Sequence, residues 1–103
     1  MASVLMEQTF ETPLTEQDEA DFAKRLDECL ELRGGAWARS YLATDRRRMI
    51  CEFVAADAES VREALRSAGL SFDRAWSATV YAAEDYPEHL AKLNDVRTRL
   101  ASR

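Results

Sequence analysis

The feature that most constrains the fold of this chain is a pair of helical segments, each set between stretches that alternate like β-strands. Apolar side chains recur every three or four residues in the two segments, which gives each helix one apolar face. The stretches around them alternate between apolar and polar positions. The predicted helices cover residues 16–33 and 58–68, and the predicted strands cover residues 3–10, 36–44, 48–55 and 74–82.

Capping and turn signals define the ends of both helices. Thr15, with Asp18 three positions later, resembles a capping box, and Asp57 supplies an N-cap for the second helix. Gly34 and Gly69 follow the two helices, where a left-handed backbone conformation is common. The resulting order is strand–helix–strand–strand–helix–strand.

This order predicts an α+β fold, the ferredoxin-like split β-α-β-β-α-β sandwich. Right-handed crossovers give the strand order 4-1-3-2 and place both helices on one side of the sheet. We expect residues 1–83 to form this domain. Residues 84–103 should add an amphipathic C-terminal helix, with Pro87 in its first turn.

Size and charge exclude several classes of protein. A chain of 103 residues is long enough for one core, and no apolar run approaches the roughly 20 residues of a membrane helix. No apolar run follows a basic N-terminus, so we expect a cytoplasmic protein that does not bind a membrane. The net charge of −5 argues against a nucleic-acid partner. The basic cluster at residues 46–48 is expected to be a solvated hairpin turn.

Two glutamates inside otherwise apolar strands carry the functional signal. Glu52 lies in the middle of MICEFVA and Glu7 in the middle of VLMEQTF. Because an unpaired charge buried under a helix costs several kcal/mol, alternation should point both side chains away from the helices. The residues predicted on the helix side are Val4, Met6, Phe10, Ala38, Ser40, Leu42, Met49, Cys51, Phe53, Trp76, Ala78 and Val80. Those predicted on the opposite side include Glu7, Thr9, Trp37, Arg39, Tyr41, Ile50, Glu52, Val54, Thr79 and Tyr81.

The side of the sheet that lacks helices would therefore expose much aromatic and aliphatic surface. A small monomer rarely leaves such a surface in water. The simplest cover is the same side of a second copy, so we expect a homodimer whose two sheets enclose a cavity. The C-terminal helix would wrap the partner or close that cavity.

The two glutamates are predicted on neighbouring central strands, where facing residues lie about 4.5–5.5 Å apart if the register matches. One pKa should then rise unless a cation lies between them, and Arg39 is the cation that the chain offers. Three interpretations remain open: an ion-pair network that sets strand register and dimer geometry, a ligand or metal site, and general acid/base catalysis.

The cysteines and the histidine do not indicate a catalytic or metal-binding function. Cys29 and Cys51 follow no metal-ligand or redox spacing and are expected in the core. His89 is expected at the surface of the C-terminal segment. The sequence has no phosphate loop, nucleotide fingerprint or nucleophile triad.

The segments LMEQTFETPLTEQD, RSYLATDRRRMICEFVAADAESVREALRSAG and FDRAW together resemble a family of small bacterial ferredoxin-like proteins of unknown function that includes nickel-binding members. The resemblance spans about residues 4–81 and implies a homodimer and, in some members, bound nickel. Histidine ligands for nickel do not carry over, because the core of this chain contains no histidine. The matching core positions are Glu7, Arg39, Tyr41 and Glu52.

We therefore expect an uncharacterised dimeric module that binds a small molecule or a cation in the cavity between the sheets. The expected ligand-binding residues are Arg39, Tyr41, Trp37, Thr9, Thr79 and Tyr81. One alternative is a cofactor-free enzyme, such as an isomerase, cyclase or oxygenase-like catalyst, with Glu52 or Glu7 as general base. The other is a purely structural dimer domain. No metal ligands are expected, and no cofactor beyond a weakly held divalent cation.

Overall fold

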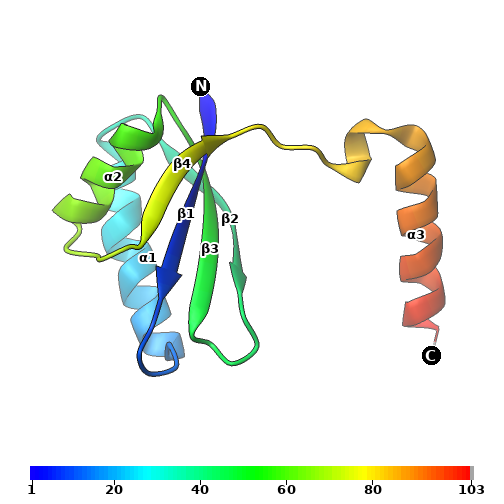
Figure 1. The fold of residues 1–103 in the computed structure, drawn as a ribbon, viewed down its shortest axis with the longest axis horizontal. Helices are drawn as coiled ribbons and strands as arrows, with labels where there is room; N and C mark the ends of the chain where they lie inside the picture. Colours follow the sequence, from blue (N-terminus) through cyan, green and yellow to red (C-terminus); the bar gives the residue numbers. More distant parts are fainter. Residues whose placement is uncertain (103) are drawn as a thin grey trace.

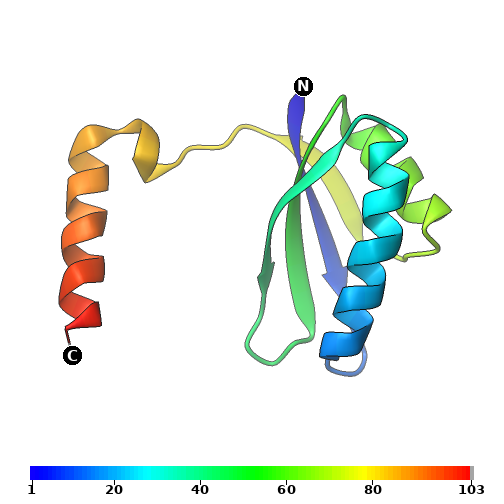
Figure 2. The same ribbon diagram turned by 180° about the vertical axis from the view of Figure 1, so that it is seen from behind.

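The computed structural model describes residues 1–102 and has the order of elements expected from the sequence (Figure 1). The elements are β1 (Ala2–Thr9), α1 (Glu16–Glu31), β2 (Ala36–Leu42), β3 (Arg48–Ala55), α2 (Ala58–Ser67), β4 (Arg74–Ala78), the short 3-10 helix η1 (Ala83–Asp85) and α3 (Pro87–Ala101). The four strands form one antiparallel sheet in the order β2-β3-β1-β4. Helices α1 and α2 lie on the same side of it (Figure 2). The predicted ferredoxin-like α+β arrangement is therefore confirmed.

The predicted capping residues hold the helix ends. The Thr15 hydroxyl accepts a hydrogen bond from the backbone N–H of Asp18 at 3.1 Å, and the Asp57 carboxylate accepts one from Ser60 at 2.8 Å. Gly34 and Gly69 each have a φ of +72°, a conformation that favours glycine. The sequence signals thus place both helices correctly, to within two residues at the end of α1.

The core fills the space between the sheet and the two helices. Phe53 at the centre of β3 and Leu65 of α2 are fully buried. The buried cluster consists of Val4, Met6, Leu26, Leu30, Cys51, Phe53, Ala55, Val61, Ala64, Leu65, Ala68, Leu70 and Ala75. On β1 the strand ends before Phe10, so Gln8 continues the helix-side row, and its Nε2 donates to the Ser71 carbonyl at 2.8 Å.

A bulge in β2 corrects the predicted side of Trp37. Trp37 is opposite Phe53, and Arg39 is opposite Glu52, so Ala38 is an extra residue between them. The bulge shifts the alternation by one position, which turns Trp37 toward the helix side while Arg39 and Tyr41 keep the predicted direction. Alternation alone cannot reveal such a shift.

The predicted phase of β4 is also wrong. Ala75 is opposite Met6 and is buried under α2, whereas Arg74 and Trp76 are opposite Glu7 and Leu5 on the other side of the sheet. Trp76 therefore points away from the helices, where it is 36% exposed. The strand ends at Ala78, so Thr79, Val80 and Tyr81 lie beyond the sheet.

The last helix is separated from the rest of the domain. An extended segment leaves β4 and leads through η1 into α3, which stands well away from the sheet (Figures 1 and 2). Within residues 1–102, η1 is the one element that α3 contacts. Leu100 on α3 is 55% exposed. None of the helices in this range is both long and apolar enough to span a membrane.

Replacing Phe53 by alanine should lower the free energy of unfolding by about 3–5 kcal/mol, because a fully buried aromatic side chain leaves a cavity. The measurement is urea denaturation followed by circular dichroism. Leu32→Ala is the control, since that side chain is 84% exposed and its loss should change stability by less than about 0.5 kcal/mol. Similar losses in both variants would contradict the position of the core.

Candidate functional site

The side of the sheet opposite α1 and α2, here called the open face, carries all the ion pairs that join strands. It is defined by strand register. Its residues are Ser3, Leu5, Glu7, Thr9, Ala36, Arg39, Tyr41, Arg48, Ile50, Glu52, Val54, Arg74, Trp76 and Ala78. Both candidate glutamates belong to it, as predicted.

Glu7 lies between two arginines from neighbouring strands. Arg48 Nε on β3 donates to Glu7 Oε2 at 2.8 Å, and Arg74 Nε on β4 lies 3.0 Å from Oε1. The glutamate is only 6% exposed, while both arginine side chains are mostly in solvent. The hydrogen bond from Arg48 lowers the pKa of Glu7 below its ordinary value, with help from the charge of Arg74 and against the effect of burial. Glu7 is therefore an ionised, fully paired carboxylate.

Glu52 has a cation of its own. Arg39 lies directly opposite it on β2, with its Nε 3.2 Å from Glu52 Oε1. The side chain of Glu52 is 12% exposed and that of Arg39 is 60% exposed. The expectation that Arg39 compensates a strand glutamate is confirmed for Glu52.

The two glutamates are not directly opposite each other. Glu7 faces Ile50, and Leu5 faces Glu52, so the acids are offset by two residues along neighbouring strands. Such diagonal neighbours are about 7–8 Å apart, more than the directly opposed pair considered above. A rise in the pKa of Glu7 is expected only for two unpaired acids that face each other. The offset and the paired arginines both oppose that rise, and the pKa of Glu7 is lowered instead.

The other predicted binding residues are dispersed. Tyr41 lies on the open face and is 63% exposed, and Thr9 ends β1 on the same face. Trp37 lies on the helix side because of the bulge. Thr79 and Tyr81 belong to the segment between β4 and η1 and are not part of the sheet.

Sequence reasoning missed Arg48 and Arg74, the two partners of Glu7. A solvated turn is expected at residues 46–48, but Arg48 lies an even number of residues from Ile50 and Glu52 and so shares their side of β3. That parity was a usable signal. A phase of β4 that buries Trp76 places Arg74 on the helix side, so this expectation hides the ion pair. In the structure the small side chain of Ala75 packs under α2 instead.

A hollow of about 200 Å³ lies at the hairpin end of the open face. It is bordered by β2, by β3 and by the start of the hairpin between them. The lining residues are Tyr41, Leu42, Ala43, Arg48 and Ile50. The hairpin end of the sheet therefore offers a small hollow lined by an arginine and a tyrosine.

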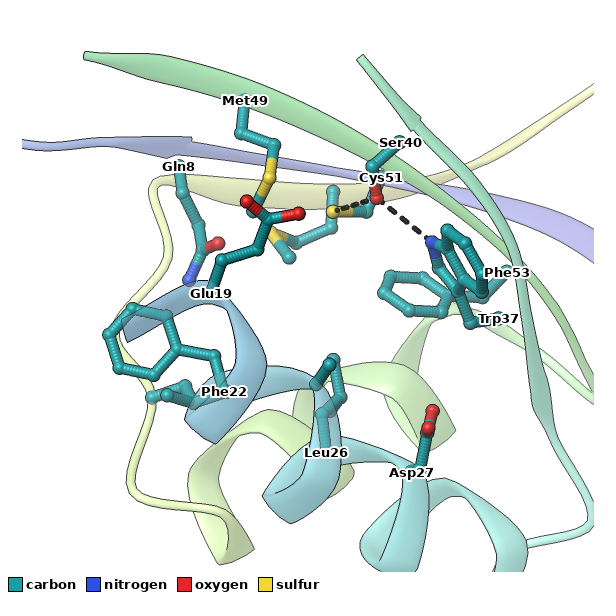
Figure 3. A pocket seen from close by; sticks show the side chains of 13 residues that line it. Gln8, Glu19, Phe22, Leu26, Asp27, Trp37, Ser40, Met49, Cys51 and Phe53 are labelled. Carbon is teal, nitrogen blue, oxygen red and sulfur yellow. Dashed lines mark hydrogen bonds between the residues drawn. The ribbon is translucent and has the colours of Figure 1, made fainter. Parts of the chain in front are cut away.

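A second cavity, of about 210 Å³, lies on the helix side between α1 and the sheet, and the sequence did not predict it (Figure 3). Phe22 and Leu26 of α1 form one wall, and Met49, Cys51 and Phe53 of β3 form another. Trp37 reaches this cavity through the bulge in β2.

A chain of hydrogen bonds runs along one wall of this second cavity. The Trp37 indole N–H donates to the Ser40 hydroxyl at 2.9 Å, and that hydroxyl donates to the Cys51 sulfur at 3.0 Å (Figure 3). Burial raises the pKa of the Cys51 thiol above its ordinary value, and the nearby charge of Glu19 adds to the rise, while the bond from Ser40 opposes it. The free thiol is therefore protonated and ordered.

Histidine, cysteine and carboxylate side chains do not converge on a metal site in the part of the chain that the structure describes. No group of three or more histidine, cysteine, aspartate or glutamate side chains is placed to hold a metal ion within residues 1–102. His89 lies on α3, edge-on to the Tyr86 ring, with the ring centroids 6.2 Å apart.

Comparisons with known proteins agree with this fold. A family model described as nickel responsive protein SCO4226-like matches residues 5–77. The crystal structure of SCO4226 from Streptomyces coelicolor A3(2) is similar, with a TM-score of 0.71 and 12% sequence identity. The similarity covers 79% of this chain and 100% of that one, and at this identity it shows a shared fold. No curated protein matches the sequence.

The ion pairs of Glu7 should make stability depend on pH. Because the folded-state pKa of Glu7 is lowered, its contribution is present above its ordinary pKa of 4.5 and is lost as the pH falls through the folded-state value. Glu7→Gln should therefore reduce the free energy of unfolding at neutral pH, and its difference from the unsubstituted protein should shrink in acid. Urea denaturation at about pH 7 and pH 3 measures both values.

The control for this experiment is Glu11→Gln, which neutralises an exposed loop glutamate. It should change stability little at either pH. A Glu7→Gln variant that is equally destabilised in acid and at neutral pH would show that the carboxylate acts through its shape and not through its charge.

Proposed function

The chain belongs to the SCO4226-like family of nickel responsive proteins, and we propose that it works as a homodimeric binding module. In this proposal the open faces of two copies meet, and the cavity between them takes a small molecule that carries an anionic group. The observation that carries the proposal is the uncovered open face, with paired acids beside exposed aromatic and aliphatic side chains.

Exposed apolar residues favour a cover over this face. Tyr41, Val54 and Trp76 are 63%, 39% and 36% exposed, and they lie on three different strands of one surface. Helices α1 and α2 occupy the other side of the sheet, and α3 does not contact the sheet in the described residues. An apolar patch rimmed by charged groups is typical of an interaction surface.

The charges of the open face favour an anion over a cation. Three arginines and two glutamates leave one excess positive charge there, in a chain whose net charge is −5. Both glutamates already accept hydrogen bonds or ion pairs from arginines, whereas each arginine has further N–H donors. Arg48 and Tyr41 both line the hollow at the hairpin end, and their guanidinium and hydroxyl groups are the donors that a bound carboxylate or phosphate group would use.

The residues of this chain do not fit a nickel site. Nickel prefers imidazole ligands, and the single histidine is on α3. Glu7 and Glu52, the acids of the open face, each hold an arginine that a divalent ion would have to displace. We therefore assign no role to nickel or to a weakly held divalent cation in this module.

The catalytic alternative gains little support from Glu7, because a carboxylate with a lowered pKa is a weak general base.

The structural interpretation has a specific observation in its favour. Ion pairs between side chains link all four strands: Arg39 with Glu52 joins β2 to β3, and Glu7 with Arg48 and Arg74 joins β1 to β3 and β4. In our proposal these ion pairs set the strand register and also form the floor of the binding cavity.

We further propose that residues 1–83 are the binding domain and that α3 acts as an arm that packs on the second copy. Its apolar side chains include Leu90, Leu93 and Leu100, which lie at helical spacing along one stripe. The extended segment before η1 gives the arm its reach (Figure 1).

Sedimentation velocity should show a species with twice the mass of one chain. Ile50→Lys should raise the dissociation constant of this dimer by at least about a hundredfold, because a buried unpaired charge costs several kcal/mol. Leu32→Lys, on an exposed residue at the end of α1, should leave the dimer unchanged. A monomer at high protein concentration would disprove the dimer, and equal effects of both variants would disprove the chosen face.

A thermal-shift screen of small carboxylates and phosphates should identify an anion that stabilises the protein. An anion present at about one hundred times its Kd adds about 2.7 kcal/mol of stability. Tyr41→Ala should abolish the shift, whereas Trp37→Ala, an aromatic deletion on the opposite side of the sheet, should retain it. Equal shifts from the uncharged amide of the same compound, or from both variants, would contradict an anion site on the open face.

A further inference from the structure

The cavity on the helix side contains an unusual set of ligands for its size. Three sulfur atoms, from Met6, Met49 and Cys51, line the same space of about 210 Å³. These residues come from the two central strands, β1 and β3, and all lie on the helix side of the sheet. Figure 3 shows Met49 and Cys51 reaching from the sheet into the gap above Phe22 and Leu26.

Strand register brings the three sulfur-bearing side chains together. Met6 is directly opposite Cys51 in the β1–β3 pair, and Met49 lies two residues from Cys51 on the same side of β3. Side chains at such positions start from Cβ atoms about 5 Å and 7 Å apart. Methionine has three rotatable bonds, so its sulfur can move toward a shared ion without a change in the backbone.

The cysteine sulfur is already oriented. Ser40 donates a hydrogen bond to Cys51 Sγ at 3.0 Å, and Trp37 fixes that hydroxyl from the other side at 2.9 Å. The thiolate is the form that binds metals, so an ion that binds here must displace the thiol proton. The Trp37 ring also closes one end of the cavity, next to the site where positive charge would be held.

We propose that this cavity is a binding site for a soft monovalent cation, Cu(I) in the cell, held by the Cys51 thiolate and the Met6 and Met49 thioethers. Thiolate and thioether ligands suit soft ions such as Cu(I), and the two thioethers make this donor set softer than the thiolate and imidazole sets typical of zinc. Binding breaks the S–H bond of Cys51, releases one proton to solvent and forms an S–Cu bond without a change in oxidation state. One thiolate and one monovalent ion are neutral together, which limits the cost of placing the ion beside the buried Cys51 and Met6 side chains.

The site is independent of the proposed function, because it lies on the opposite side of the sheet from the open face. It also differs from the donor set that nickel prefers, since no imidazole borders the cavity. Glu19 and Asp27 of α1 also line the cavity, and Glu19 is paired with Arg46 at 3.3 Å. The proposal requires the three sulfur atoms as ligands and not these carboxylates.

Anaerobic titration of the full chain with Cu(I), in competition with a chromogenic Cu(I) chelator, tests the proposal. We expect one ion per chain. Cys51→Ser should weaken binding by at least about a hundredfold and Met49→Leu by about tenfold, since the first removes the charged ligand and the second a neutral one. Met49→Leu conserves volume at a half-buried position, so this variant should fold, and its melting temperature verifies that.

Cys29→Ser provides the matched control, because Cys29 lies on α1 and does not line the cavity. It should leave Cu(I) affinity unchanged, and X-ray absorption at the copper edge should show sulfur ligands only. Equal losses in Cys29→Ser and Cys51→Ser, a cysteine effect without a methionine effect, or preferred binding of Ni(II) or Zn(II) to Cys51 would each overturn the site.

Discussion

The structure depends on one buried carboxylate and the two arginines that neutralise it. Glu7 lies at the centre of the sheet, and a charge that is only 6% exposed must have partners if the fold is to be stable. Arg48 supplies one partner from β3 and Arg74 the other from β4. This requirement determines the phase of β4, because Arg74 can reach Glu7 only from the open face. The small side chain of Ala75 then packs under α2, and Trp76 points away from the helices.

The two sides of the sheet consequently carry different chemistry. On the open face each glutamate is paired with at least one arginine, and these ion pairs join neighbouring strands. The three arginines outnumber the two glutamates, so this face has a positive charge although the whole chain is acidic. On the helix side the contacts are apolar, but α1 does not fill the space above β2 and β3. The extra residue at Ala38 turns Trp37 into that space, where Ser40 and Cys51 complete a chain of hydrogen bonds.

Because α3 is separated from the sheet, two surfaces remain uncovered within residues 1–102: the open face and the apolar stripe of α3. Both belong to the same chain, and the extended segment between them holds them apart (Figure 1). A second copy would cover the open face with a surface of the same shape, and the arm would then cross between copies. The proposed dimer would thus bury the exposed tyrosine and tryptophan side chains of the open face, which no helix covers within residues 1–102.

The sequence by itself determined the order of elements, the ends of both helices and the direction of Glu7 and Glu52. Those features depend on local signals: Thr15, Asp57, Gly34 and Gly69 act within a few residues, and alternation along one strand separates its two sides. Tertiary structure alone decided the bulge at Ala38, the phase of β4 and the offset between the two acids. Such features depend on contacts with neighbouring elements. In β4, for example, Arg74 pairs with Glu7 of β1 and Ala75 packs under α2, and these two contacts agree with only one phase of the strand. The cavity beside Cys51 also depends on tertiary structure, because it lies between α1 and the sheet. The pattern of a single segment does not predict such a space.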